Sequence, residues 1–423
     1  MQWRYSPVGR RLFRLATGGT KLRPILAAFG ALTISAVMVT SGAATANAQP
    51  IWPNPDPDPF YAAPADIGSK ANGDVLASRP MPPLFYFPNA SVTLIKFRST
   101  NSQGEPIAAT TTVLTPNGHR ADAPLLSFQH IINGLGTQCA ISHGLYANDT
   151  NFIVPFAPAL NIALLRGWSV ALPDHLGPTS AYGAAKLGGQ ITLDGVRAAQ
   201  RLAQLALGKS PVALAGYSGG GMATAWAAAL APKYAPELNI VGAAEGGVPM
   251  NLQTMGWGIG HNQHPAFGLA FAAVLGLERE YPDRLPITDA LSQRGLAAAR
   301  DIANSCTNDL IARGVGHTFD DYAKDNVMAH DPKAWAVADE NSVELYAGVP
   351  DAPIFEWHSP QDNLIPLDAI ANTVGRYCRA GVRVESELFP SPDHLTTAVI
   401  GFPSMLNWLD GRYSGKPAPS NCA

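Results

Sequence analysis

The sequence predicts an α/β fold in which a mostly parallel sheet carries helices on both faces. Short apolar strand-like runs alternate with helical patterns, one glycine-rich turn joins such a run to a helix, and a long helical stretch interrupts the alternation once. At 423 residues the chain can form one large domain with an insertion. We expect residues 49–250 and 351–423 to form the core and residues 251–350 to form an inserted helical cap or lid.

Residues 1–48 have the features of an exported leader. Six basic residues and no acidic one are followed by an apolar run from Ile25 to Val39 and by Ala46-Asn47-Ala48. A basic start, a short apolar stretch and an A-x-A site are typical of a cleavable signal peptide. We therefore predict a secreted or cell-envelope protein, with an uncleaved anchor as the alternative.

Charge and cysteine content narrow the class further. Loss of the leader would change the formal net charge from −3 to −9, which argues against nucleic acid or an anionic lipid surface as an electrostatic partner. The four cysteines of an exported chain predict two disulfides, and the residues alone leave the pairing open. Because no two are spaced as C-x-x-C, a zinc or redox centre is not expected.

The core begins with a hairpin and continues with buried strands. A proline-rich, extended lead-in over residues 49–65 precedes two β-rich segments, Ser91–Thr100 and Pro106–Thr115, which flank a Gly-containing turn. Apolar runs bounded by Gly or Pro then predict parallel strands at Leu125–Gln129 and Ser169–Leu172, and helical spacing follows over Thr192–Leu207.

In the second half of the chain a helical insert interrupts the alternation of strands and helices, and the alternation then resumes. The insert has helical spacing, as in His264–Glu278, and no clear strand. Strand character resumes over Ala352–Trp357 and Val382–Phe389, and a last helix is expected over Thr396–Leu409. A second packing domain without a gating role is the alternative interpretation of the insert.

The most informative motif is Gly216-Tyr217-Ser218-Gly219-Gly220. It follows the apolar run Pro211–Ala215 and precedes the small-residue helix pattern Gly221–Ala229. Such a strand–turn–helix needs glycines on both sides of the serine, and it exposes the hydroxyl at a helix N-terminus. This is the nucleophile elbow of α/β-hydrolases, and Ser218 is the predicted nucleophile. A plain glycine turn is the alternative.

A serine needs a general base and an orienting acid, which follow it in this fold in the order acid, then histidine. Asp362 comes just past the strand ending at Trp357, and His394 follows the next strand. Helix capping is the alternative role for either residue. His261 and His264 have H-x-x-H spacing, but no third ligand stands nearby, so no metal is expected.

An oxyanion hole requires two backbone N–H donors. The elbow supplies Gly219, the residue after the nucleophile. The second donor is expected in the loop after Leu125–Gln129, residues 130–138, where Asn133-Gly134 is the predicted turn. The chemistry alone leaves the choice between these two residues open.

Together these motifs resemble the secretory lipase family over nearly all of the chain after the leader. The resembling segments are Asp58–Tyr61, Ser127–Cys139, Gly167–His175 and Gly216–Gly220. The resemblance implies Ser218, Asp362 and His394 as a catalytic triad, and Asn133 as the second oxyanion donor at a position where the family has an aspartate. It also implies disulfides Cys139–Cys306 and Cys378–Cys422, and a cap that holds an acyl-binding tunnel.

The function expected from residues and resemblance is hydrolysis of lipid carboxylic esters through an acyl-enzyme on Ser218. The expected partner is a small lipid or ester, with contact to a lipid interface and without nucleic acid, and no cofactor is expected. The alternatives are an acyltransferase with the same triad, a serine peptidase on this fold, and a non-catalytic secreted protein.

Overall fold

A sheet of nine strands runs through the residues that this computed structural model describes, 49–147 and 155–422. The predicted leader lies outside them. The strands are β1 (Val75–Met81), β2 (Ala90–Thr100), β3 (Pro106–Pro116), β4 (Leu125–Gln129), β5 (Ser169–Pro173), β6 (Val212–Tyr217), β7 (Ile240–Gly246), β8 (Ile354–His358) and β9 (Val384–Leu388).

The order of the strands is β1-β2-β3-β5-β4-β6-β7-β8-β9. β1, β2, β3 and β5 pair antiparallel in succession, whereas β4 to β9 all run parallel. The predicted hairpin is confirmed, since β2 and β3 pair from Ala90 opposite Pro116 to Thr100 opposite Pro106. β4 and β6 are neighbours, but the chain continues from β4 to β5 on one side and from β6 to β7 on the other, and such a switch point is where open α/β sheets bind ligands.

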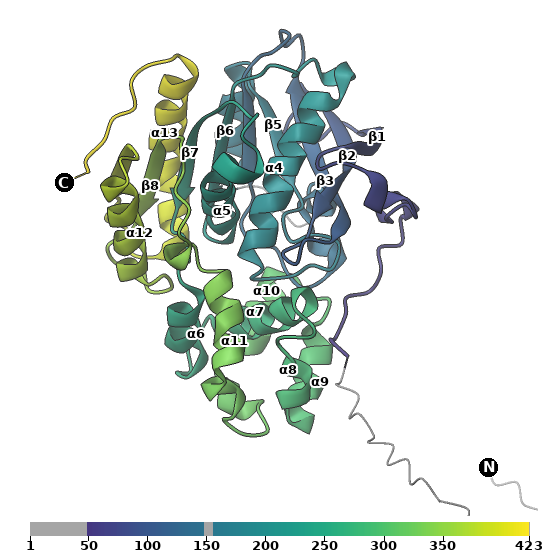
Figure 1. Ribbon diagram of the computed structural model, residues 1–423, viewed down its shortest axis with the longest axis vertical. Coiled ribbons are helices and arrows are strands. Elements are labelled where there is room, and N and C mark those ends of the chain that lie inside the picture. The colour runs from purple at the N-terminus through teal and green to yellow at the C-terminus, as the bar shows by residue number, and fades with distance from the viewer. Residues whose placement is uncertain (1–48, 148–154, 423) are drawn as a thin grey trace, which may run out of the picture. The chain divides into compact units, whose positions relative to one another are not determined.

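Helices cover both faces of the sheet, as predicted. They are α1 (Ile141–Gly144), α3 (Ala157–Leu165), α4 (Ala185–Arg201), α5 (Gly219–Tyr234), α12 (Leu367–Arg379) and α13 (His394–Tyr413). Figure 1 views the sheet from the side of α4, α5 and α12, while α13 lies behind it. Neighbouring side chains of β6 illustrate the two cores, because Leu214 packs with the α4–α5 side and Ala213 with the α3–α13 side.

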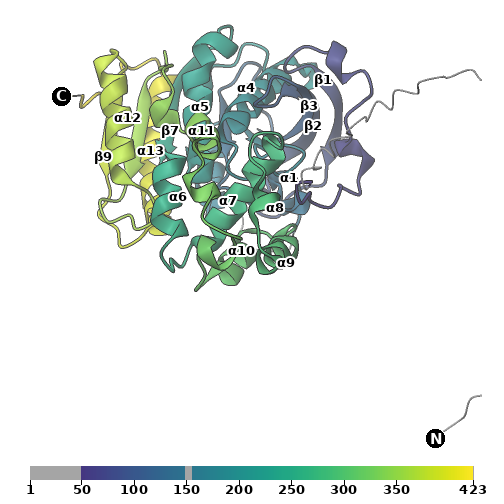
Figure 2. The ribbon, with the colours of Figure 1, turned by 60° about the horizontal axis from the view of Figure 1, so that its bottom comes forward.

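The stretch between β7 and β8 is helical, as the sequence predicts. It contains α6 (Leu252–Gly260), α7 (Phe267–Glu280), α8 (Ile287–Ala290), α9 (Gln293–Ile302), α10 (Thr307–Gly314) and α11 (Pro332–Glu340). Figures 1 and 2 place these helices together beyond one end of the sheet strands. None of the helices in the described part of the chain has the length and apolar character needed to cross a membrane.

Three local predictions differ from the structure. α4 starts at Ala185 instead of Thr192 and ends at Arg201 instead of Leu207. Its first turns contain two glycines, Gly188 and Gly189, which count against a helix locally but allow close contact with α5: a Cβ on Gly189 would lie 2.7 Å from the Trp226 Cβ. The chain leaves the helix before Ala206, whose φ is 50°.

The other two differences concern the ends of the domain. α13 starts at His394 and not at Thr396, because the Asp393 side chain accepts from the Thr396 N–H over 2.8 Å and so caps the helix one residue before the histidine. β1 has no counterpart among the predicted strands; it contains Pro80 in its interior and lies at the edge of the sheet, where a strand tolerates proline.

Candidate active site

The turn after β6 holds Ser218 in a conformation rare for a residue with a side chain. Its φ of 54° and ψ of −124° correspond to a strain of roughly 1–3 kcal/mol. α5 begins at the next residue, and the Ser218 N–H donates to the Gly246 carbonyl at the end of β7 over 2.8 Å. The half-buried serine therefore stands at the carboxyl end of the sheet and at the N-terminus of a helix, as the elbow motif predicts.

The glycines after the serine are required by close packing. A Cβ on Gly219 would overlap the side chain of Ile132, and one on Gly220 would overlap the Gln129 carbonyl at the end of β4. The elbow is therefore seated directly against the loop that follows β4. As the first residue of α5, Gly219 leaves its N–H without a partner inside the helix.

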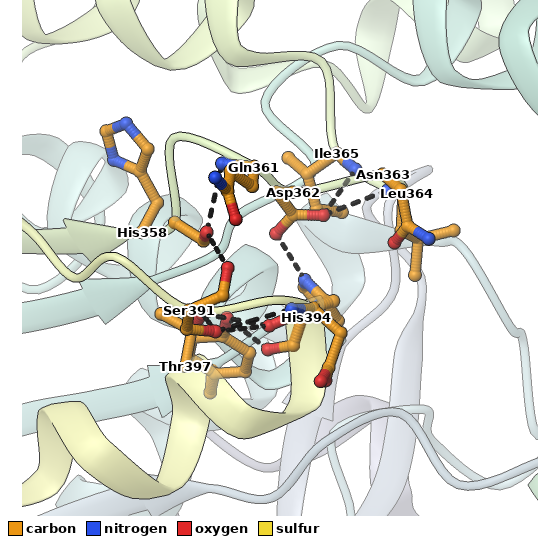
Figure 3. A network of polar contacts seen from close by, with 12 residues as sticks. His358, Gln361, Asp362, Asn363, Leu364, Ile365, Ser391, His394 and Thr397 are labelled. Atoms are coloured by element: carbon orange, nitrogen blue, oxygen red, sulfur yellow. Dashed lines mark hydrogen bonds and ion pairs between the residues drawn. The ribbon is translucent and has the colours of Figure 1, made fainter.

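Asp362 and His394 come together from two loops. Asp362 lies in the loop after β8, His394 is the first residue of α13, and the His394 Nδ1 and Asp362 Oδ2 are 2.7 Å apart (Figure 3). The other carboxylate oxygen accepts from the N–H groups of Leu364 and Ile365 over 2.9 and 3.0 Å. The carboxylate is thus fixed by its own loop and aimed at the imidazole.

The electrostatics of this pair keep Asp362 charged. The Asp362 side chain is fully buried, and burial alone would raise its pKa. The hydrogen bond and charge of His394, together with the two backbone N–H groups, outweigh that effect and hold the pKa below its usual value. An ionised carboxylate can hold the imidazole with Nδ1 protonated and Nε2 free to accept a proton.

The imidazole of His394 lies beside the elbow. A Cβ on Gly247 would lie 2.9 Å from the His394 Cε1, and Gly247 directly follows the residue that accepts from the Ser218 N–H. The His394 Nε2 is buried and has no hydrogen-bond partner among the described residues. The structure thus joins Asp362 to His394 directly and brings His394 next to the elbow without a hydrogen bond to Ser218, a contact that often tightens only with substrate.

Asn133 lies where the second oxyanion donor is expected. It is buried, and it follows Ile132, whose side chain contacts the Gly219 position. Its carbonyl accepts from the N–H and the hydroxyl of Thr307 over 2.9 and 2.7 Å, and its Oδ1 lies 2.9 Å from the His130 Nδ1. Its carbonyl and side-chain oxygens, which can only accept, are therefore engaged elsewhere. The groups of Asn133 that can donate are its backbone N–H and its side-chain NH₂.

Two disulfides link distant segments of the chain, and one of them lies next to the candidate site. Cys139 is bonded to Cys306, which ties the segment after β4 to the start of α10, and Cys378 is bonded to Cys422, which ties α12 to the C-terminal tail. The first disulfide lies next to Thr307, so the candidate oxyanion loop and the helical insert are joined covalently and by hydrogen bonds at the same place.

The sequence analysis missed Arg279, a buried cation on α7. Its guanidinium donates to backbone carbonyls only, at Ile51, Leu135, Thr179, Ser180 and Ala303, over 2.6–3.2 Å. Burial lowers its pKa to about 10. Arg279 thus links the helical insert to three other segments, which are the loop after β4, the loop after β5 and the lead-in over residues 49–65. The sequence contains one signal for it, the charged run Glu278-Arg279-Glu280 inside an otherwise apolar helix. Such a run usually indicates an exposed surface, whereas all three residues are buried here.

The helices of the insert line an apolar pocket of about 130 Å³ that is open to the surface. Most of its lining is apolar; Phe271, Ile287, Phe319, Met328 and Trp335 are among the residues. A much smaller space of about 10 Å³ lies against the elbow, between Ile132, Gly219 and Met222. The insert also reaches the acid loop, since the His264 Nε2 lies 3.2 Å from the Asn363 carbonyl.

The two histidines with H-x-x-H spacing, His261 and His264, have other contacts. His261 stacks on Trp257 with ring centroids 4.4 Å apart, and His264 contacts the acid loop. The described residues contain no group of three or more His, Cys, Asp or Glu side chains arranged to hold a metal ion.

Comparisons with known proteins agree with this architecture. A family model described as secretory lipase matches residues 156–421. A secreted triacylglycerol lipase of Malassezia furfur is 31% identical over 382 residues, which cover 86% of this chain and 77% of the relative. A "probable inactive lipase" of Mycobacterium tuberculosis is 30% identical over 380 residues, covering 86% and 83% of the two chains. The closed-state structure of Candida antarctica lipase A superposes with a TM-score of 0.80 at 30% identity, covering 88% of this chain and 90% of that chain.

The mostly parallel sheet, its helices and the elbow define an α/β-hydrolase. Within that class the chain belongs to the secretory lipase family. It is a carboxylic ester hydrolase of the lipase type, so its class of substrate is the esters of lipids.

Proposed function

We propose that Ser218, His394 and Asp362 act as nucleophile, general base and orienting acid. The observation that carries the proposal is the 2.7 Å contact between Asp362 and His394, with the imidazole packed beside the elbow that presents Ser218. The His394 Nε2 takes the Ser218 proton as Oγ attacks the ester carbonyl, and Asp362 stabilises the imidazolium. His394 then protonates the leaving alcohol, and water repeats the sequence on the acyl-enzyme.

The backbone N–H groups of Gly219 and Asn133 form the proposed oxyanion hole. The contact between the Gly219 position and Ile132 supports this pairing, because it seats the two donors against each other. Each such donor contributes roughly 3–4 kcal/mol to stabilisation of the tetrahedral intermediate. The engagement of the Asn133 Oδ1 with His130 favours the backbone N–H over the side chain as the donor. An asparagine in place of the family's aspartate then has little effect on the chemistry.

Residues 251–350 serve in this proposal as a cap that binds the acyl chain and excludes water. The apolar pocket among the cap helices and their contacts with the oxyanion and acid loops support that role. Triacylglycerols are the proposed substrates, as the name of the Malassezia furfur relative suggests.

Contact with a lipid interface belongs to the same proposal. The outer surface of α13 begins next to His394 and exposes Leu395, Val399 and Ile400, and residues 394–409 contain no Asp, Glu, Lys or Arg. Val399→Asp with Ile400→Asp should lower the ratio of emulsion to soluble-ester hydrolysis, while Ala371→Asp on the exposed surface of α12 should not. An unchanged ratio would remove this part of the proposal.

Export through a cleaved leader is also proposed, on the pattern in residues 1–48 and the membership of a secretory family. N-terminal sequencing of the exported protein should find a start after Ala48. A retained leader would indicate an anchor instead.

The decisive experiment compares wild type with Ser218→Ala on p-nitrophenyl esters of increasing chain length and on emulsified triacylglycerol. The variant should lose ester hydrolysis and labelling by a fluorophosphonate while its thermal unfolding stays unchanged. Hydrolysis at the wild-type rate in the variant would refute the triad. Wild-type protein that neither labels nor hydrolyses would support a non-catalytic role, which the relative named as a probable inactive lipase makes a real alternative.

A further inference from the structure

The peptide groups on both sides of the His394 Cα are held by hydroxyl groups. The Tyr217 hydroxyl donates to the His394 carbonyl over 2.7 Å. On the other side, the Ser391 and Thr397 hydroxyls lie 2.8 and 3.0 Å from the Asp393 carbonyl, which belongs to the peptide bond between Asp393 and His394. Figure 3 labels Ser391, Thr397 and His394. We infer that these hydroxyls form a clamp that positions the imidazole of His394 for the proposed reaction, with Tyr217 as its principal residue. This inference rests on the triad proposed above.

Tyr217 connects the clamp to the nucleophile itself. It is the last residue of β6 and directly precedes Ser218, and its side chain is fully buried. Its ring also packs on the imidazole, with centroids 4.9 Å apart. One residue therefore contacts both the peptide unit that leads to the nucleophile and the backbone of the base, and so helps to set the separation of Ser218 and His394.

The chemistry of the phenol suits this role. Burial raises the pKa of Tyr217 well above its usual value, so the hydroxyl remains protonated and can donate at neutral pH. The His394 carbonyl has two lone pairs, so it can accept from Tyr217 and still serve as the first acceptor of α13. Buried hydrogen bonds of this kind are strong because no water competes for them.

The hydroxyl pair acts on the other side of the histidine. Ser391 Oγ and Thr397 Oγ1 are also 2.8 Å from each other, and both residues are buried. Two protons serve three short contacts, so either both hydroxyls donate to the Asp393 carbonyl, or one donates to the carbonyl and the second donates to the first. With Asp362 on Nδ1, the histidine is thus held at its ring and at both flanking peptide groups.

The test removes one oxygen atom. Tyr217→Phe keeps the ring packing and loses the donor, and Tyr413→Phe is the matched control, because the Tyr413 hydroxyl donates to the Leu125 carbonyl over 2.8 Å at the opposite end of the sheet. Both variants should lose thermal stability, and Tyr413→Phe at least as much as Tyr217→Phe, because the Tyr413 hydroxyl also accepts from the Ala213 N–H over 3.1 Å. Tyr217→Phe should lower kcat about tenfold with KM unchanged, since small misplacement of reacting groups slows the chemical step, whereas Tyr413→Phe should leave kcat unchanged.

A second measurement covers the case in which Tyr217→Phe does not fold. Thr397→Val should lower kcat and shift the downfield proton resonance of the His394 Nδ1–H, and Thr397→Ser should restore both because it keeps the hydroxyl. Equal kcat values for the two tyrosine variants, or equal values for Thr397→Val and Thr397→Ser, would overturn the clamp. If Ser218→Ala retains full activity, the triad fails instead, and the two failures are distinguishable.

Discussion

The nucleophile side of the site and its acid–base side are held in place by different forces. Ser218 is fixed by packing: its turn is strained, and the adjacent glycines touch Ile132 and the Gln129 carbonyl without room for a methyl group. Asp362 and His394 stand on loops that are linked mainly by hydroxyl and backbone hydrogen bonds, such as that from the Ser359 hydroxyl to the Ser391 carbonyl over 2.8 Å.

This difference has a consequence for how each side responds to mutation. Packing against backbone cannot relax by small steps, so an added atom on the nucleophile side should reduce the amount of folded enzyme. A hydrogen bond can be lost singly, so changes on the acid–base side should alter the rate of folded enzyme. Four substitutions, ordered by expected effect, test this contrast.

Asp362→Asn should have the largest effect on the acid–base side. The amide cannot stabilise the imidazolium or fix the tautomer, so kcat should fall roughly 10⁴-fold with the fold intact. Rates on a soluble ester and thermal unfolding measure both parts. Asp393→Asn is the control, because Asp393 caps α13 and asparagine caps equally well. A loss below tenfold for Asp362→Asn would reject its assignment as the acid.

Gly220→Ala tests the nucleophile side. The added Cβ would overlap the Gln129 carbonyl and lie 2.5 Å from the His130 carbonyl, so we expect a loss of roughly 3 kcal/mol in the free energy of unfolding. Gly411→Ala in α13 is the control, since its Cβ would meet nothing closer than a lysine carbon at 4.0 Å. Denaturant titration compares the two. A stable Gly220→Ala enzyme with a low kcat would contradict the contrast drawn above.

Glu245 lies on β7, between the two sides, and makes stability depend on pH. Burial, and then the charge of Glu356 on β8, raise its pKa from 4.5 to about 8, and neither carboxylate oxygen has a hydrogen-bond partner among the described residues. The folded state therefore binds this proton more tightly than the unfolded state. Its stabilising contribution is complete below about pH 4.5 and is lost as the pH rises towards 8.

Glu245→Gln should remove that dependence. Between about pH 4.5 and 8, the unfolding free energy of the wild type should fall, relative to that of the variant, by roughly 1.4 kcal/mol per pH unit. Below about pH 4.5 the difference between the two unfolding free energies should be constant. Denaturant titrations at several pH values measure the gap. Parallel profiles would show that Glu245 ionises normally in the fold.

Ser359→Ala should have the smallest effect. The variant loses one buried hydroxyl that links the acid loop to the histidine loop, so kcat should fall a few-fold and stability by about 1 kcal/mol. Thr373→Val is the control, because among the described residues that buried hydroxyl bonds only the Ala369 carbonyl of its own helix. Thr373→Val should lose about as much stability as Ser359→Ala while keeping the kcat of the wild type. Equal kcat values for both would mean that the loop link is only structural.

Much of the core could be predicted because its signals are local. The apolar runs at β4, β5 and β6 and the glycine spacing around Ser218 each specify a backbone conformation within a few residues. Ser218, Asp362 and His394 could be predicted to lie close together, because the chain leaves their strands at the same edge of a parallel sheet. Their roles in catalysis remain a proposal that the experiments above address.

Short-range periodicity and glycine placement are enough to predict the α/β class, the hairpin, the elbow and the two carboxyl-edge loops. The folded molecule alone reveals that Gly188 and Gly189 belong to a helix, that Arg279 binds three core segments through their carbonyls, and that Tyr217 reaches His394, 177 residues further along the chain. These contacts join residues distant in the chain. The free energy of a buried hydrogen bond or a close helix contact depends on what lies opposite, and no local pattern records the partner.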